Sequence, residues 1–146
     1  MPFRGENRTH RRLDLPGLVA SLGLDDRVRL SGFVDEAGLA DRYAAADAAV
    51  CLSEYEGFGL PALEAAARGV PLVVGDAPSL GEIFAPAALL VPPRDESAVA
   101  RALDDILTDP LLQERLSAAG RALAGEYSWD RTATLTRGVL LQAAGR

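Results

Sequence analysis

The sequence predicts an α/β fold in which helices cover a parallel sheet, and three observations support this. Short apolar runs at 48–52, 72–74 and 88–91 alternate with longer segments of helical pattern, an order typical of parallel sheets. These runs are continuously apolar, as expected of strands that are buried on both faces. Hydrophobic residues make up 49% of the chain, which is enough to form a core.

Length and charge narrow the class of protein. With 146 residues, the chain is predicted to form a single domain over 1–146. Its net charge of −6 argues against a nucleic-acid partner. The sequence shows neither a signal-peptide pattern nor an apolar run of about 18 residues. We therefore expect a soluble cytoplasmic protein and leave open whether it touches a membrane surface.

The residue types exclude several chemistries. All fifteen basic residues are arginine, so this chain offers no lysine for a Schiff base or a phosphate-binding P-loop. His10 is the only histidine and Cys51 the only cysteine, which leaves no pattern for a zinc site or an intrachain disulfide. Cys51 lies in an apolar run and is predicted to be a small buried hydrophobic residue. We expect neither a metal nor a cofactor.

The first part of the chain is predicted to contain a tail, a short helix and a strand. Residues 1–12 are polar, show no period and are interpreted as a flexible or atypical tail. A helix is predicted over 13–24, because Pro16 suits a first turn and Gly23 suits the end of a last turn. Residues 27–34 begin with alternating polar and apolar side chains and are interpreted as a fourth strand followed by a loop.

The middle of the chain is predicted to run from a helix through a strand into a second helix. The first helix covers 35–47 and carries Tyr43 on its apolar face. The apolar strand at 48–52 follows, and an Ala-rich helix then runs over about 61–68. Gly69 suits the left-handed residue that ends such a helix.

The last part of the chain carries two strands and then helices alone. A loop and a single helical turn over 80–84 separate the strands at 72–74 and 88–91. Three helices are predicted after them, over 98–107, 109–124 and 129–143, the first capped by Asp95 or Ser97 and the last by Ser128. One small sheet does not need three closing helices. We expect one of them to pack against something other than this sheet.

The stretch from Glu56 to Glu64 is the strongest candidate for a site. Two glycines, Gly57 and Gly59, stand between the apolar strand and the Ala-rich helix. A strand, a glycine turn and a helix N-terminus together let a ligand approach backbone N–H groups closely. Ionised carboxylates only accept hydrogen bonds, so Glu56 and Glu64 would receive hydroxyls, amines or a metal rather than phosphate. A nucleotide sugar offers both phosphates and vicinal hydroxyls.

A plainer interpretation of the same stretch stays open on spacing alone. The two glycines would then only make a tight turn, with Glu56 solvated and Glu64 on an exposed helix face. Strand–turn–helix units with a glycine pair are common, and the spacing is not that of the dinucleotide-binding motif, which needs a third glycine.

The motifs resemble those of the group 1 (family 4) retaining glycosyltransferases, which have the GT-B fold. The central motif is SEYEGFGLPALEA at 53–65, which includes the Glu-x7-Glu pattern of that family. The similarity extends to VRLSGFV at 28–34, to AALLVP at 87–92 and to the Ser-Trp pair at 128–129. It covers about residues 13–139. The resemblance implies a Rossmann-like sheet that forms most of the C-terminal, nucleotide-sugar-binding half of a GT-B enzyme.

The resemblance also implies roles for individual residues. Glu56 would be the catalytic residue and would face the hydroxyls of the donor sugar. Glu64 would receive the ribose hydroxyls. The backbone around Phe33 and Val34 would hold the base. The backbone amides that approach the sugar and the diphosphate would be those of Gly57, Phe58, Gly59 and Leu60.

The implied reaction is transfer of a hexose from a nucleotide diphosphate sugar to an acceptor, with retention at the anomeric carbon. Family members neutralise the diphosphate with an arginine and a lysine, and this chain lacks the lysine and the expected context for the arginine. The N-terminal, acceptor-binding domain of the family is also missing from this sequence. In the family the last helix packs on that domain, so the resemblance implies that the helix at 129–143 either carries an uncovered apolar face here or folds back onto this domain. We therefore expect a truncated enzyme, inactive without an N-terminal partner domain or a second copy, whose donor base, donor sugar and acceptor stay open.

Two other functions compete with this one. The chain could be a non-catalytic remnant that keeps the fold and binds another protein. It could also belong to a related GT-B enzyme such as a nucleotide-sugar epimerase, although those enzymes do not usually share the motif at 56–59 in this form.

Overall fold

The computed structural model describes residues 14–145, which divide into two compact units between Glu36 and Ala37. The predicted tail at 1–12 lies outside the described residues. In the first unit, helix α1 (Leu15–Ser21) begins where the Asp14 carboxylate accepts a hydrogen bond from the Gly17 N–H at 3.0 Å. The backbone turns left-handed at Gly23, with φ of +65°. The predicted short helix is therefore confirmed, with slightly narrower bounds.

The strand predicted over 27–34 is wrong. Residues 28–35 are irregular, and the three-stranded sheet contains none of them. Alternating side chains specify a strand only where a neighbouring strand takes up the backbone N–H and C=O groups. Three of the four large apolar side chains in this segment, those of Val28, Leu30 and Phe33, are exposed.

The second unit is built on a three-stranded parallel sheet in the order β1-β2-β3. Strands β1 (Ala49–Cys51), β2 (Leu72–Gly75) and β3 (Ala88–Val91) lie where the apolar runs predicted them. Val73 of β2 is in register with Val50 of β1 and with Leu89 of β3. All four residues of β2 are buried, as expected of a central parallel strand. The α/β fold with a parallel sheet is thus confirmed.

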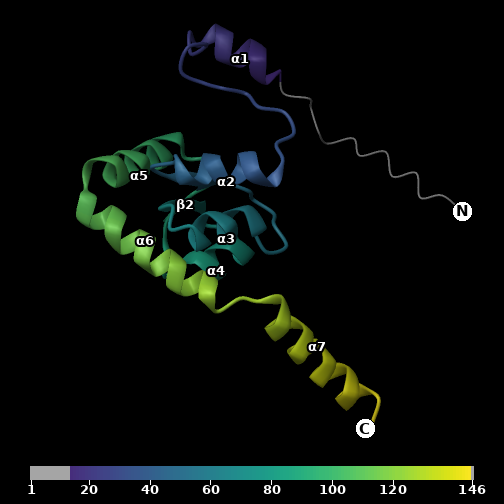
Figure 1. Cartoon of the computed structure of the whole chain (residues 1–146). Coiled ribbons are helices and arrows are strands. Elements are labelled where there is room, and N and C mark those ends of the chain that lie inside the picture. The colour runs from purple at the N-terminus through teal and green to yellow at the C-terminus, as the bar shows by residue number, and fades with distance from the viewer. Residues whose placement is uncertain (1–13, 146) are drawn as a thin grey trace, which may run out of the picture. The chain divides into compact units, whose positions relative to one another are not determined.

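In the second unit, one helix precedes β1, and five helices connect or follow the strands (Figure 1). Three of them begin at side-chain caps: the acceptors are Asp95, Asp109 and Ser128, the last bonding the Arg131 N–H at 3.1 Å. The predicted caps are therefore confirmed, with Asp95 rather than Ser97 at the first position. The bounds are α2 (Glu36–Ala44), α3 (Leu60–Ala67), α4 (Pro78–Phe84), α5 (Glu96–Thr108), α6 (Pro110–Gly125) and α7 (Trp129–Ala143).

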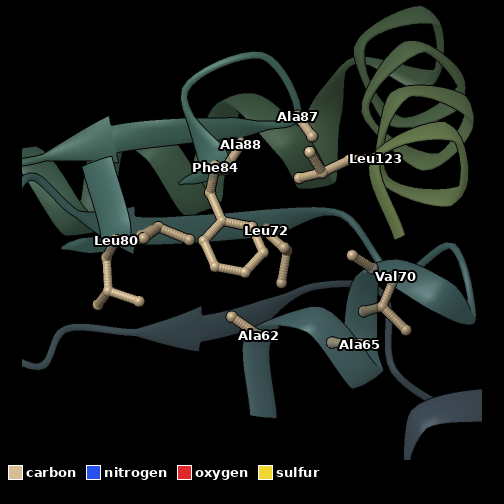
Figure 2. Packing of buried hydrophobic residues seen from close by; sticks show 11 residues of the cluster. Ala62, Ala65, Val70, Leu72, Leu80, Phe84, Ala87, Ala88 and Leu123 are labelled. Atoms are coloured by element: carbon tan, nitrogen blue, oxygen red, sulfur yellow. The ribbon is translucent and has the colours of Figure 1, made fainter. Parts of the chain in front are cut away.

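The pleat of β2 divides the core into two clusters, one on each face of the sheet. Leu72 and Val74 point to the face that α3 and α4 cover, where the fully buried Phe84 fills the centre. Figure 2 shows the Phe84 ring between Leu80 and Leu72, with Ala62 of α3 close to it. Val73 points to the opposite face, where it packs with Ile106 of α5. Helix α6 contributes to both clusters.

Small residues bring α3 close to α6. Ala65 and Ala66 of α3 are buried, and a side chain on Gly120 of α6 would contact the Ala66 backbone at 3.4 Å. Helix α3 ends at Gly69, whose φ of +75° is the left-handed end that the sequence predicts. This packing holds α3, which begins at the glycine turn, rigidly against the sheet.

Helix α7 carries the uncovered apolar face that was one of the two expectations for it. None of its residues is buried, and Trp129 is 80% exposed. The other exposed apolar side chains of this helix are Leu135, Val139, Leu140 and Leu141. Among the described residues, no helix is long and apolar enough to cross a membrane.

Candidate functional site

The glycine turn joins the end of β1 to the start of α3, and Gly59 is its most constrained residue. Its φ is +86°, in the left-handed region that favours glycine. A Cβ atom at this position would come well inside 3.0 Å of Leu80 Cδ2 and within 3.4 Å of Phe84 Cε2. Gly59 therefore lets the turn lie directly on α4 before Leu60 begins α3.

Gly57 has the opposite environment. A Cβ atom built on it would meet no heavy atom within 4 Å. The residue is exposed and its φ is not positive. Neither local conformation nor packing requires a glycine here, so the missing side chain leaves one side of the backbone open to a ligand.

Glu56 is half-buried and is anchored through its backbone. Its carbonyl oxygen accepts a hydrogen bond of 2.5 Å from the hydroxyl of Ser79, a residue of α4. Among the described residues, its carboxylate accepts one hydrogen bond, a long one of 3.5 Å from the Ser53 hydroxyl. Because a carboxylate offers about four acceptor positions, most of the capacity of Glu56 is available to a ligand. Sequence patterns gave no sign of the Ser79 contact, which joins residues 23 positions apart.

Glu64 lies on the exposed face of α3 beside an aromatic ring. The Tyr43 hydroxyl donates to the Pro61 carbonyl oxygen at 3.1 Å, and the Arg68 guanidinium lies 5.1 Å from the Tyr43 ring centroid. Burial raises the pKa of Tyr43, and the negative charge of Glu64 raises it further. Arg68 also donates to the Glu64 carbonyl oxygen at 3.1 Å. Tyr43 was predicted only as a residue of the apolar face of its helix.

A bidentate ion pair joins the loop after β1 to the loop after β3. Arg94 Nη2 donates to Glu54 Oε2 at 2.7 Å, and its Nε donates to Oε1. The hydrogen bond from Arg94 and its positive charge lower the pKa of the Glu54 carboxyl. Parallel strands present their carboxyl ends at one edge of the sheet, so this pair ties the start of the turn to the same edge.

The remaining predicted site residues lie at the turn or in the first unit. Phe58 packs edge-on against Tyr127, with ring centroids 5.2 Å apart, and both line a hollow of about 300 Å³ with Arg131. Phe33 and Val34 belong to the first unit, so their role at the base stays a prediction. In the part of the chain that the structure describes, no three His, Cys, Asp or Glu side chains gather to hold a metal ion.

Comparisons with known proteins give the context of this site. The family described as "Glycosyl transferases group 1" matches residues 9–123. A curated relative, the O-antigen chain mannosyltransferase B of Escherichia coli, is 39% identical over 109 residues, which are 75% of this chain and 29% of the relative. The chain thus spans less than a third of the length of that relative.

Two solved structures share the fold. A sucrose-phosphate synthase from Thermosynechococcus elongatus superimposes with a TM-score of 0.81 at 35% identity, covering 89% of this chain and 33% of that one. The C-terminal domain of a group 1 glycosyl transferase from Francisella tularensis superimposes with a TM-score of 0.67 at 32% identity, covering 76% and 58%. The architecture is therefore part of a GT-B fold, as the resemblance implied. With a family match over most of its length, the chain belongs to the group 1 glycosyl transferases.

Proposed function

We propose that this chain is the donor-binding part of a retaining glycosyltransferase that takes a hexose from a nucleotide diphosphate sugar. The glycine turn would receive the sugar and the diphosphate, with Glu56 facing the sugar hydroxyls and Glu64 facing the ribose. The base would lie against the backbone around Phe33 and Val34. The relatives support a hexose, since the one from Escherichia coli is named as a mannosyltransferase.

The observation that carries this proposal is the start of α3. Helices α1, α5, α6 and α7 each begin at a side chain that accepts a hydrogen bond from a first-turn N–H group. At α3 the residue before the helix is Gly59, and no side chain caps the first turn. Helix α4 also begins without a side-chain cap, but of the two only α3 begins at the glycine turn. Unsatisfied N–H groups at a helix start favour an anionic ligand. Gly57 leaves the approach to this end of the helix open.

The two glutamates fit the other half of such a ligand. A sugar or a ribose presents hydroxyl donors, and a carboxylate that receives them discriminates strongly against analogues that lack them. Glu56 is held by Ser79 through its carbonyl and keeps acceptor capacity on its carboxylate. The leaving diphosphate also needs stabilisation of its developing charge. We propose that a further domain supplies part of that charge and binds the acceptor, so that sugar transfer requires it.

The direct test is titration of the chain with UDP, GDP and ADP, followed by amide NMR. We expect one of them to shift the amide signals of Gly57, Gly59 and Glu64. Glu64→Ala should weaken binding of the nucleotide, while Glu56→Ala should weaken binding of the nucleotide sugar more than that of the nucleotide. If no nucleotide shifts these amides at millimolar concentration, the donor site is wrong.

A second candidate is a non-catalytic module that keeps the fold and binds another protein. The exposed apolar side chains of α7 favour it, because exposed apolar surface of this kind marks interaction sites. The two functions can be distinguished by a phenotype assay in a cell that depends on the natural gene product. Loss of sugar transfer in Glu56→Ala and Glu64→Ala, with folding intact, supports the enzyme, whereas an unchanged phenotype supports the module.

A further inference from the structure

Tyr43 is placed to control the glutamate that the proposed function assigns to the ribose. It lies in the last turn of α2, and its half-buried ring packs against the core cluster that contains α3. Its hydroxyl reaches the Pro61 carbonyl in the first turn of α3 at 3.1 Å. The Arg68 guanidinium at the end of α3 lies over its ring at 5.1 Å. Tyr43 thus contacts both the first turn and the C-terminal end of α3, the helix that carries Glu64.

Glu64 is less constrained than the Tyr43 ring. It is exposed on α3, and an exposed glutamate samples several rotamers. Ordering a flexible side chain on binding costs free energy, and a preorganised neighbour reduces that cost. A rigid hydroxyl beside the carboxylate is such a neighbour, because it can donate a hydrogen bond to an ionised carboxylate in only a few orientations.

The Tyr43 hydroxyl has one proton, which it donates to Pro61, and Glu64 lies three residues further along α3, on the same face of the helix as Pro61. Its hydrogen bond to Pro61 is a bond to a neutral carbonyl, whereas a bond to an ionised carboxylate is stronger. Burial raises the pKa of Tyr43 most, and the negative charge of Glu64 raises it further. At neutral pH the hydroxyl therefore keeps its proton and stays a donor beside Glu64.

We propose that Tyr43 is a positioning residue that orients the Glu64 carboxylate toward the 2′ and 3′ hydroxyls of the donor ribose, with Arg68 holding the Tyr43 ring in place. This inference rests on the proposed function, since it assumes that Glu64 receives the ribose. Tyr43 acts through Glu64 and does not itself touch the ligand. The hydroxyl is the group that matters, while the ring serves to pack the end of α2.

The test compares ribose with a sugar that lacks the two hydroxyls. The full chain is titrated by calorimetry with whichever of UDP, GDP and ADP binds most tightly, and with its 2′,3′-dideoxy counterpart. Tyr43→Phe keeps the ring and removes the hydroxyl. We expect it to weaken ribonucleotide binding about threefold to tenfold, the effect of one modest hydrogen bond, and to leave dideoxynucleotide binding unchanged. The combined Tyr43→Phe and Glu64→Gln variant should bind no more weakly than Glu64→Gln alone.

A second variant and a control keep the outcomes distinct. Arg68→Met removes the cation over the ring but keeps the Tyr43 hydroxyl, and should weaken ribonucleotide binding alone, about twofold to fivefold. Equal weakening of both ligands by Tyr43→Phe, or no weakening at all, would overturn the positioning role. If Glu64→Gln leaves ribonucleotide binding unchanged, or if the unaltered chain binds no nucleotide, then the proposed function itself is wrong and the role of Tyr43 falls with it.

Discussion

The two glycines of the turn should respond in opposite ways to the same substitution. Gly59→Ala places a Cβ atom on a residue with φ of +86°, which costs an L-residue roughly 1 to 2 kcal/mol. The same Cβ atom collides with Leu80, a fully buried side chain that has little room to move. Overpacking of this kind costs about 1 to 3 kcal/mol. We therefore expect Gly59→Ala to lower the free energy of unfolding by about 2 to 5 kcal/mol.

Gly57→Ala is the matched control. Its Cβ atom meets no heavy atom within 4 Å, and its φ is not positive. We expect its free energy of unfolding to stay within about 0.5 kcal/mol of the unaltered chain, as for an ordinary surface substitution. Nucleotide binding should nevertheless weaken, because the added methyl group stands where the ligand would approach the backbone.

Urea denaturation followed by far-ultraviolet circular dichroism measures the stability of both variants, and calorimetry measures nucleotide binding. The reasoning fails if Gly59→Ala unfolds within about 0.5 kcal/mol of the unaltered chain, a surface-like value. It fails equally if Gly57→Ala is destabilised as strongly as Gly59→Ala, since the open space at Gly57 would then be wrong.

Three further substitutions test the packing, an ion pair and a helix cap. Phe84→Ala should cost about 3 to 5 kcal/mol in urea denaturation because Phe84 is fully buried, whereas Leu107→Ala, at a position 56% exposed, should stay within about 0.5 kcal/mol. Arg94 lowers the pKa of the Glu54 carboxyl, so their ion pair stabilises the fold above the ordinary carboxyl pKa and this stabilisation is lost as the pH falls through the lowered pKa. In Arg94→Ala, carbon-13 NMR should show the Glu54 pKa rising to its ordinary value. An unchanged pKa would contradict this. Asp109 caps two N–H groups of α6, at 2.9 and 3.1 Å, so Asp109→Ala should lower the melting temperature by the equivalent of about 1 kcal/mol, and no change would show that solvent replaces the cap.

Features that depend on a few neighbouring residues could be predicted from the sequence. Ser128 and Asp95 cap helices because an acceptor side chain reaches an N–H group three positions along the chain. Gly69 ends α3 because the left-handed conformation is inexpensive for glycine alone. The buried strands could be predicted for a similar reason, since continuous apolar runs are hard to place anywhere but inside a sheet.

The contacts that shape the site could not be predicted in this way. The hydroxyl of Ser79 meets the carbonyl of Glu56 across 23 residues, and Arg94 meets Glu54 across 40. Such pairs depend on how β1, β2 and β3 bring their following loops to one edge of the sheet, which no local pattern encodes. The error at 27–34 has the same origin, because alternation describes a side-chain pattern and does not supply a pairing partner.

The charges around the glycine turn limit how tightly the proposed donor site can bind a diphosphate. Three carboxylates lie in or close to the turn, and a diphosphate repels each of them unless the carboxylate faces another group. Arg94 neutralises Glu54, while Glu56 and Glu64 are the two that we assign to hydroxyls. The attraction for phosphate then rests on the uncapped N–H groups at the start of α3, which act as about half a positive charge. Half a charge against a diphosphate predicts weak binding to this chain, and under the proposed function stronger binding where further cations are supplied.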